Sequence, residues 1–379
     1  MADIVVAPVT DKRGFEQFIR VPAELYRGHK GWVPPLLLER RESLHFEKNP
    51  YFQHAQAQYW LALRDGKPVG RISAQIDQAY LQRYRDATGH FGLIDAIDDR
   101  TIHGALLHAA EDWLRARGMK RVTGPYNLSI NEEVGLMIDG FDTSSMMLMG
   151  YNAAYAPAHV EAAGYVKIRD LIGYDYDVTS ATETLGKRLA ERLPENSRIA
   201  LRRVDMKEFN RDLRLLLDIF NDAWQDNWGF VPFSEAEIVA LAKILKPLVV
   251  RDLAWFVELD GQGVGMILAL PNVNEAIADL EGRLLPFGWA KLLWRLKVRG
   301  LKSARVPLMG VRMKYRGTAL GAALALMVID ALRVNGKRLG YQRAELGWIL
   351  ENNTVVRRII ESVGGQPYKT YRLYEKPLA

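Results

Sequence analysis

The stretch of sequence that decides the fold is Pro307-Leu-Met-Gly-Val-Arg-Met-Lys-Tyr-Arg-Gly-Thr-Ala-Leu-Gly-Ala322. It predicts a strand over residues 306–313, a turn of small residues, and a helix over residues 322–334. The first N–H groups of a helix have no acceptor within the helix and lie at its positive end. Because small side chains also let a ligand approach the backbone, the turn is a candidate pyrophosphate-binding site. It is neither a Walker A loop nor G-x-G-x-x-G.

The elements around this turn occur twice in the chain. Asp65-Gly-Lys-Pro-Val-Gly70 is echoed by Asp260-Gly-Gln-Gly-Val-Gly265, and Asp-Gly between two apolar runs predicts a β-hairpin. Each hairpin is followed by a strand, a helix, a strand, a short helix ending in glycine and a last strand. We therefore predict an α/β protein (α+β, with a mixed sheet) built as a tandem duplication; two unrelated α/β domains are the alternative. The predicted division is residues 1–178, a linker at 179–198, and residues 199–379.

Composition excludes several kinds of chemistry. The 379 residues include no cysteine, which removes disulfides, thiolate nucleophiles and cysteine zinc sites. No metal site is expected. The formal net charge is +6, and residues 282–329 contain ten Lys and Arg but no Asp or Glu. The start of the chain has no basic segment before an apolar core, so we expect no signal peptide and a cytoplasmic location.

The turn carries a resemblance to a known family. Arg316-Gly-Thr-Ala-Leu-Gly321 resembles the R-x-x-G-x-G/A coenzyme A loop of the GNAT acyltransferases, with Ala319 at the first small position. The segment from Asn353 to Gly364 is similar to the family's N-x-x-A-…-G spacing. The resemblance covers residues 199–379 in these motifs and residues 5–178 in outline. The double-domain outline resembles a bacterial branch of GNAT proteins that includes bacterial ceramide synthases.

The resemblance implies an acyl-CoA-dependent N-acyltransferase, an enzyme of EC class 2.3.1. Acyl-coenzyme A (or acetyl-CoA) would be the co-substrate and an amine the acceptor, with no tightly bound cofactor. Asn353 would lie near the thioester. Many members have a tyrosine general acid where this chain has Ile360. The residues implied to bind the coenzyme are Gly310, Val311, Arg312, Arg316, Gly317, Thr318, Ala319, Leu320 and Gly321. By the same resemblance, we expect Gly321→Glu to abolish coenzyme binding and leave the fold intact.

The first copy lacks the coenzyme turn. Its equivalent segment is Asp98-Asp-Arg-Thr-Ile-His103, before Gly104. Two acidic side chains would repel a pyrophosphate. We therefore predict that residues 1–178 form a degenerate GNAT-like domain that binds no nucleotide.

Two sets of residues are candidates for catalysis and acceptor binding. Glu345 lies within an apolar strand, where burial can raise the pKa of a carboxyl until it acts as a base near neutrality. Pairing of Glu345 with a nearby arginine is the alternative. In the family, the segment 220–232 shapes the acceptor pocket; core anchoring by its tryptophans is the alternative there. The candidate substrate-binding residues of this segment are Asn221, Trp224, Asn227 and Trp228.

Residues 284–299 combine an apolar aromatic face with basic side chains. Trp289 and three leucines share one side of the expected helix, and Lys and Arg share another. This pattern favours contact with an anionic membrane surface or with a long acyl chain, so Trp289 is a further candidate substrate-binding residue. An ordinary amphipathic core helix is the alternative.

The leading function is direct transfer of an acyl group from acyl-CoA to an apolar or lipid-like amine, such as a sphingoid base. The absence of cysteine fits a reaction without a thiol intermediate. A non-catalytic acyl-CoA or lipid-binding protein of GNAT fold is the alternative, suggested by Ile360. We do not expect a nucleic-acid partner, because no basic stripe is interleaved with exposed stacking aromatics. Peripheral contact at the inner membrane face is expected from residues 284–299.

Overall fold

The computed structural model describes residues 4–180 and 199–378, so the predicted linker lies largely outside the described residues. The strands are β1 (Ile4–Pro8), β2 (Ala55–Arg64), β3 (Lys67–Asp77), β4 (Thr88–Ala96), β5 (Arg121–Gly124), β6 (Leu136–Asp139), β7 (Val166–Asp177), β8 (Ile199–Arg203), β9 (Ala254–Leu259), β10 (Gln262–Pro271), β11 (Ser303–Val311), β12 (Arg343–Leu350) and β13 (Gln366–Pro377). The α-helices are α1 (Lys12–Leu25), α2 (Leu37–Ser43), α3 (Gln78–Tyr84), α4 (Arg100–Arg115), α5 (Ala156–Ala162), α7 (Phe209–Trp224), α8 (Glu235–Leu245), α9 (Val273–Ile277), α10 (Gly288–Trp294), α11 (Ala319–Arg338) and α12 (Thr354–Ser362).

The predicted order of elements is present twice. In each half a hairpin (β2–β3, β9–β10) leads to a strand, a long helix, a strand, a short helix and a last strand. Both hairpins turn on the expected dipeptide: φ is positive at Asp65 and Gly66 and again at Asp260 and Gly261. Glycine and aspartate tolerate this left-handed conformation, which matches the twist of the two paired strands.

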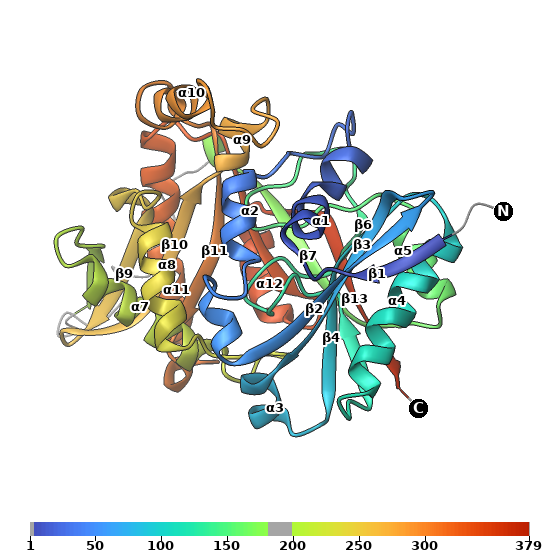
Figure 1. The fold of residues 1–379 in the computed structure, drawn as a ribbon. Helices are drawn as coiled ribbons and strands as arrows, with labels where there is room; N and C mark the ends of the chain where they lie inside the picture. The colour runs from blue at the N-terminus through green and yellow to red at the C-terminus, as the bar shows by residue number, and fades with distance from the viewer. Residues whose placement is uncertain (1–3, 181–198, 379) are drawn as a thin grey trace.

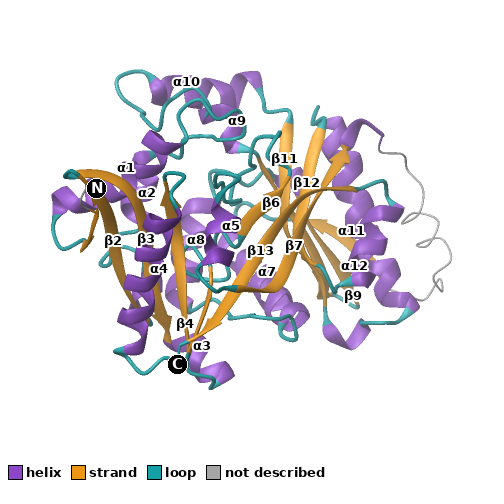
Figure 2. Cartoon of the chain, turned by 90° about the vertical axis from the view of Figure 1, so that its right-hand side faces the viewer, coloured by secondary structure: helices purple, strands orange, loops and turns teal. Residues whose placement is uncertain are grey.

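One continuous sheet joins the two halves. Its order is β1-β2-β3-β4-β5-β13-β7-β12-β11-β10-β9-β8, and β6 pairs with β13. The last strand of each half therefore lies next to the other half: β13 pairs with β5, and β7 pairs with β12. β7 and β13 pair with each other in the middle of the sheet (Figure 2). Each half thus places its last strand in the middle of the sheet, beside a strand of the other half.

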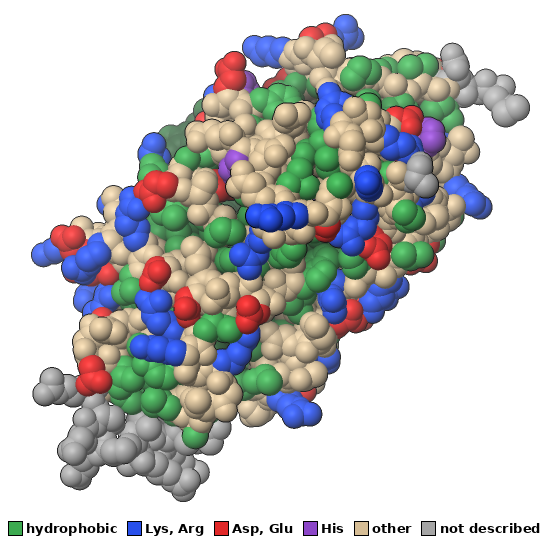
Figure 3. Space-filling model, turned by 90° about the horizontal axis from the view of Figure 1, so that it is seen from below, with side chains coloured by type: hydrophobic (Ala, Val, Ile, Leu, Met, Phe, Trp, Pro, Cys, Tyr) green, Lys and Arg blue, Asp and Glu red, His purple; other side chains and the backbone are tan. Residues whose placement is uncertain are grey.

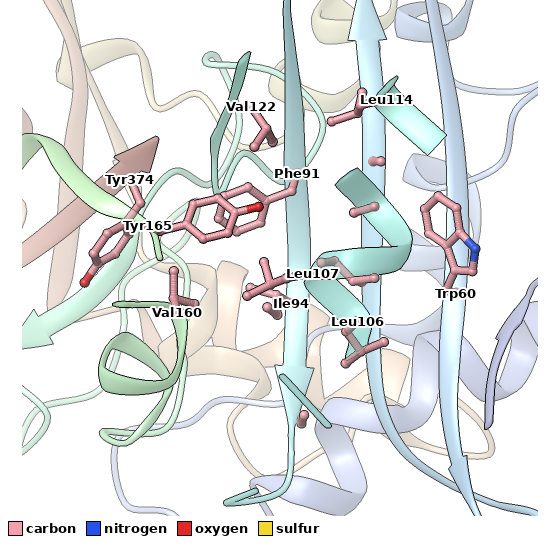
Figure 4. Packing of buried hydrophobic residues seen from close by; sticks show 14 of the residues in the cluster. Trp60, Phe91, Ile94, Leu106, Leu107, Leu114, Val122, Val160, Tyr165 and Tyr374 are labelled. Carbon is pink, nitrogen blue, oxygen red and sulfur yellow. The ribbon is translucent and has the colours of Figure 1, made fainter. Parts of the chain in front are cut away.

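The last strand of the second half, β13, also contributes to the hydrophobic core of the first half. Tyr374 of β13 is fully buried in a cluster whose other members come mostly from the first half. Figure 4 shows it beside Tyr165, with Phe91 of β4 close by. Phe91 and Tyr165 stack edge to face with ring centroids 5.1 Å apart. The C-terminus accordingly lies beside α4 (Figure 1).

In the second half, helices cover both faces of the sheet. The hydrophobic cluster between the sheet and helices α7 and α8 includes Leu268 and Leu270 of β10. The cluster between the sheet and α11 includes Ile267 and Ala269 of the same strand. Side chains alternate between the two faces of a strand, so these are opposite faces. α11 is long and apolar enough to cross a membrane by length and composition, but more than half of its apolar window (56%) is buried within the fold.

Two neighbouring parallel strands separate part-way along their length. β11 and β12 pair from Ser303–Arg343 to Val306–Leu346. Both strands then continue, to Val311 and Leu350, without pairing to each other. We call the opening between residues 307–311 and 347–350 the splay.

Candidate active site

The predicted coenzyme turn caps α11. The helix begins at Ala319, three residues earlier than expected, because the Thr318 side chain caps it and accepts from the Gly321 N–H (3.0 Å). Gly321 has no room for a side chain: a Cβ there would lie 2.1 Å from the Tyr315 carbonyl oxygen. A glutamate at this position would therefore open the turn as well as add charge. Loss of binding in Gly321→Glu would not separate these two effects.

The turn leaves donors free for an anion. Among the described residues, the N–H groups of Gly317, Ala319 and Leu320 have no hydrogen-bond acceptor. The turn is exposed from Arg316 to Ala319. Free N–H groups at the start of a twenty-residue helix, facing solvent, suit a pyrophosphate.

The basic side chains around the turn differ in their partners. Arg316 is half exposed and lies 3.4 Å from Asp226. Arg312 instead bonds the Gly263 carbonyl and Asp218 (2.5 Å), on the α7 side. Of the two, Arg316 is the one near the free N–H groups that also lines the cavity described next.

Two cavities reach the splay from opposite faces of the sheet. The first, the α11 cavity, has a volume of about 220 Å³ and extends between α11 and α12. The second, the α7 cavity, has a volume of about 110 Å³ and lies under α7 and α8. Apolar residues of the α11 cavity include Ile267, Ala269, Val306, Ile329, Leu332, Leu346, Val356 and Ile360. Apolar residues of the α7 cavity include Phe220, Phe230, Phe233, Leu241, Leu268, Leu270 and Leu308.

The two cavities share four lining residues, Trp224, Asn227, Pro307 and Trp348. Pro307 and Trp348 come from the two edges of the splay. Trp224 bonds the Met309 carbonyl through its indole N–H (3.0 Å). A molecule in the α11 cavity and a molecule in the α7 cavity can therefore meet at this opening, beside two candidate substrate-binding residues.

Comparison with known proteins identifies the family. A tandem GNAT protein from the clavulanic acid biosynthesis pathway has the same fold, with a TM-score of 0.55, 14% identity, and coverage of 100% of this chain and 99% of that one. A GCN5-related N-acetyltransferase from Sphaerobacter thermophilus aligns with a TM-score of 0.54, 15% identity, and coverage of 99% and 96%. The bacterial ceramide synthase of Caulobacter vibrioides (strain NA1000 / CB15N) is 50% identical over 379 residues, 100% of this chain and 98% of that protein. This chain belongs to its family, the tandem GNAT N-acyltransferases.

A second relative has the same extent. Protein YghO of Escherichia coli (strain K12) is 44% identical over 375 residues, 99% of this chain and 95% of that protein. No family model matches the chain. The predictions of a tandem GNAT fold and of an N-acyltransferase are confirmed, and acyl-CoA is the co-substrate that this family uses.

In this tandem GNAT acyltransferase, every second residue of β11 directs its backbone N–H and C=O groups into the splay rather than toward β10. The Arg312 N–H donates to Val264 of β10 (2.8 Å), and Gly310 is paired with Met266 of the same strand. Because backbone groups alternate along an antiparallel ladder, Gly310 and Arg312 face β10, and Val311 faces the splay. Gly310, Val311 and Arg312 are all among the residues implied to bind the coenzyme, and of these three Val311 has backbone groups that face the splay.

Asn353 and Ile360 both line the α11 cavity. Asn353 caps α12, and its side-chain oxygen accepts from the Val356 N–H (3.3 Å). Its amide nitrogen has no partner among the described residues. Ile360 is 7% exposed, so the position of the family's tyrosine is apolar here.

The acceptor-side candidates take different positions. Asn227 lines both cavities and its side chain makes no hydrogen bond among the described residues, whereas Trp228 lines the α7 cavity alone. Asn221 lines neither, and its buried side-chain oxygen has no hydrogen-bond partner in the described part of the chain. Trp289 lies on α10, 53% exposed, away from both cavities. The structure thus brings Trp224, Asn227 and Trp228 together.

Glu345 is fully buried and lines neither cavity. It accepts from Arg305 (3.1 Å) and from the Tyr368 hydroxyl. Arg305 also donates to the Gly347 carbonyl (2.8 Å), at the edge of the splay. Burial lowers the pKa of Arg305, and Glu345 opposes this shift. The geometry is that of an ion pair holding the splay, which is the alternative that the sequence left open.

In the first copy, side chains of the chain itself occupy some of the backbone donors of the equivalent turn and strand. Asp99 caps α4, accepting from the Thr101 N–H (2.9 Å), and it also pairs with Arg64. In the strand before it, the Leu93 N–H donates to the side chain of Asn127 (2.8 Å). The Asp99 carboxylate therefore occupies an N–H group in the first turn of α4, where the second copy leaves the N–H of Leu320 open.

The sequence did not single out Arg305 or Tyr368. Their common partner is Glu345, which is 40 residues from Arg305 and 23 residues from Tyr368 in the sequence. Their role can therefore be recognised only from the folded structure. A charged residue in the middle of an otherwise apolar strand, as in Ala304-Arg-Val306, is the signal that could have indicated Arg305.

Proposed function

We propose that this N-acyltransferase joins a fatty acyl group from acyl-CoA to the amine of a long-chain, lipid-like acceptor. The single observation that carries the proposal is the meeting of two apolar cavities at the splay. In this arrangement the thioester lies in the splay, with the coenzyme on the α11 side. The amine attacks from the α7 side. The name of the Caulobacter relative, bacterial ceramide synthase, supports a sphingoid base as the acceptor.

A third cavity provides room for an acceptor chain. This α10 cavity, about 400 Å³, lies between the first copy and helices α8–α10. Leu148 lines both it and the α7 cavity. Leu248, Ile277, Leu292 and Leu296 form its apolar wall. An alkyl chain attached to an amine in the α7 cavity can continue past Leu148 into this space.

Acceptor length tests the proposal. Each buried methylene contributes about 0.8 kcal/mol, so binding of a chain of ten or more carbons should greatly exceed binding of a propyl chain. We expect kcat/KM for a long-chain amine to exceed that for propylamine at least ~100-fold, measured by mass spectrometry of the amide. Equal values for the two amines would contradict a lipid-like acceptor. Binding of acyl-CoA without any amide product would favour the non-catalytic alternative.

The outer face of α10 carries exposed apolar side chains with basic neighbours. Phe287 is 79% exposed and Trp289 53% exposed. Other exposed apolar residues here are Leu285, Leu293, Trp294 and Val298. Four exposed basic residues here have no acidic partner within the described residues: Arg283, Lys297, Arg299 and Lys302. Lys291 and Arg295 are paired with Asp279, so they are not part of this basic set.

We propose that this α10 surface contacts an anionic membrane. It projects from one end of the molecule (Figure 1). On the face seen from below, by contrast, Lys and Arg are interspersed with Asp and Glu (Figure 3). Apolar aromatic side chains beside cations are typical of interfacial helices. The inner face of the same segment lines the α10 cavity, so a lipid acceptor would reach this cavity from the bilayer.

Vesicle binding tests the α10 surface. Phe287→Ser with Trp289→Ser removes two exposed aromatic side chains, so we expect flotation with phosphatidylglycerol vesicles to fall at least ~10-fold. The matched control is Val166→Ser, which removes an exposed apolar residue (58%) far from α10. Neutral phosphatidylcholine vesicles should bind the wild-type protein more weakly. Flotation of the double variant at the wild-type level would contradict the proposal.

A further inference from the structure

A polar loop of the first copy reaches the α7 cavity of the second copy. This loop, residues 125–135, joins β5 to β6, and its residues Ile130, Asn131 and Glu132 line the cavity. Asn131 donates to the Val231 carbonyl (3.0 Å). Ile130 lies against Gly229, where an added Cβ would be 3.1 Å away. The degenerate copy therefore forms one wall of the proposed acceptor site.

The loop is held in place by hydrogen bonds from the first copy. The Gln75 side chain donates to the carbonyls of Tyr126 (2.8 Å) and Leu128 (3.1 Å). Asn127 donates to Glu133 (2.8 Å), which also pairs with Arg40. A loop fixed in this way presents its side chains in one geometry, as a catalytic group requires.

Glu132 is the one acidic residue that lines either the α7 or the α11 cavity within the described part of the chain, and neither cavity has a histidine. Its carboxylate makes no hydrogen bond or ion pair in that part. Glu133, beside it, has both. Solvent reaches the Glu132 side chain although protein surrounds it on most sides. It is an available proton acceptor in the wall of the cavity that Asn227 and Trp228 also line.

We propose that Glu132 of the first copy is the catalytic base for acyl transfer in the second copy. This inference rests on the proposed function. The amine nitrogen forms the C–N bond to the thioester carbonyl carbon, and the C–S bond breaks with its electron pair on sulfur. One proton passes from nitrogen to Glu132 and then to the thiolate, so coenzyme A leaves as the thiol. The degenerate copy has lost its nucleotide turn and supplies this carboxylate instead.

The groups around Glu132 raise its pKa above the usual range of a carboxyl. Partial desolvation by the surrounding protein, followed by the negative charges of Glu133 and Glu39, raises the pKa of this solvent-exposed Glu132 carboxyl to about 8, and Arg40 opposes this shift. The charged groups around it are Glu133 on its own loop, Glu39 and Arg40 on α2, Glu237 on α8, and Arg305 across the cavity. The base works in its ionised form and the amine attacks as the free base. We therefore expect kcat/KM to rise steeply up to about pH 8, the limb due to Glu132, and less steeply above it as the amine loses its proton, with a pKa of about 10.

The test compares Glu132→Gln with the wild-type protein in acyl transfer to a long-chain amine. We expect kcat to fall about 10²–10⁴-fold, the range for loss of a general base, with acyl-CoA affinity unchanged. The pH dependence should lose its limb near 8 and keep rising toward the pKa of the amine, about 10. Glu132→Asp should retain the limb at a lower rate. Glu39→Gln should move the limb to lower pH, because it removes a nearby negative charge.

The folded state of the variants is checked by thermal unfolding. Gln at position 132 is expected to leave stability unchanged or higher, because the wild-type carboxylate is unpaired. The matched control is Glu42→Gln, which removes an exposed carboxylate on α2. The inference is overturned if the wild-type protein transfers acyl groups and Glu132→Gln does so at a rate within ~3-fold of wild type. It is also overturned if Glu132→Gln keeps the wild-type pH limb. No amide from the wild-type protein with any amine overturns the proposed function and this inference with it.

Discussion

Replacement of Ala319 by glutamate is expected to abolish measurable binding of acyl-CoA while the protein stays folded. Ala319 is the first residue of α11 and is exposed. A carboxylate in the first turn stabilises a helix by about 0.3–1 kcal/mol, so the fold should not suffer. The same carboxylate would occupy the anion site and repel the pyrophosphate. We expect Kd for palmitoyl-CoA, measured by calorimetry, to rise at least ~100-fold.

Ala319→Gln is the matched control, since glutamine has nearly the same size and no charge. It should weaken binding far less than Ala319→Glu does. Ala319 separates charge from shape better than Gly321, where any side chain meets the Tyr315 carbonyl. A Kd for Ala319→Glu within ~3-fold of the wild-type value would show that the coenzyme binds elsewhere.

Removal of the Glu345 carboxylate is expected to destabilise the protein strongly. Glu345→Leu leaves the guanidinium of Arg305, 4% exposed, buried without its ionic partner. Breaking a buried pair from one side costs about 3–5 kcal/mol in the free energy of unfolding. Arg305→Met should cost a similar amount. The double variant Arg305→Met/Glu345→Leu should recover most of the loss, because no unpaired charge remains. Urea unfolding of the four proteins provides the measurement.

A further variant, Glu345→Gln, separates the two roles considered for Glu345. If it holds the splay through Arg305, then Glu345→Gln should lower stability and leave the pH limb near 8 in place. If it were the catalytic base, Glu345→Gln would remove that limb and leave stability near the wild-type value. The second outcome would contradict the assignment of the base to Glu132.

The features that the sequence could predict are local. The Asp65-Gly66 and Asp260-Gly261 turns depend on neighbouring residues, so the hairpins were predicted where they occur. The start of α11 was predicted three residues too late, because the cap by Thr318 was not recognised in the sequence. The position of β7 and β13 could not be predicted in the same way. Both are last strands of similar units, and nothing in their own residues says which half of the sheet each one completes.

The acceptor side depends on contacts between distant segments. Glu132 lines the same cavity as Trp228, and Asn131 bonds Val231, 100 residues along the chain. The polar composition of residues 127–133 was visible in the sequence, but its position depends on how the two copies meet. Trp289 shows the converse: its periodicity was visible, yet its side chain faces solvent and Leu292 and Leu296 line the cavity.

Single-turnover transfer tests the central claim, that an amine in the α7 cavity attacks a thioester lying in the splay. Enzyme in excess would be loaded with palmitoyl-CoA and mixed with a long-chain amine, and amide and free coenzyme A would be followed by mass spectrometry. We predict one amide for each coenzyme A released, with no acylated protein, and no amide from Ala319→Glu. Release of coenzyme A with free palmitate, or a covalently acylated protein, would contradict the account.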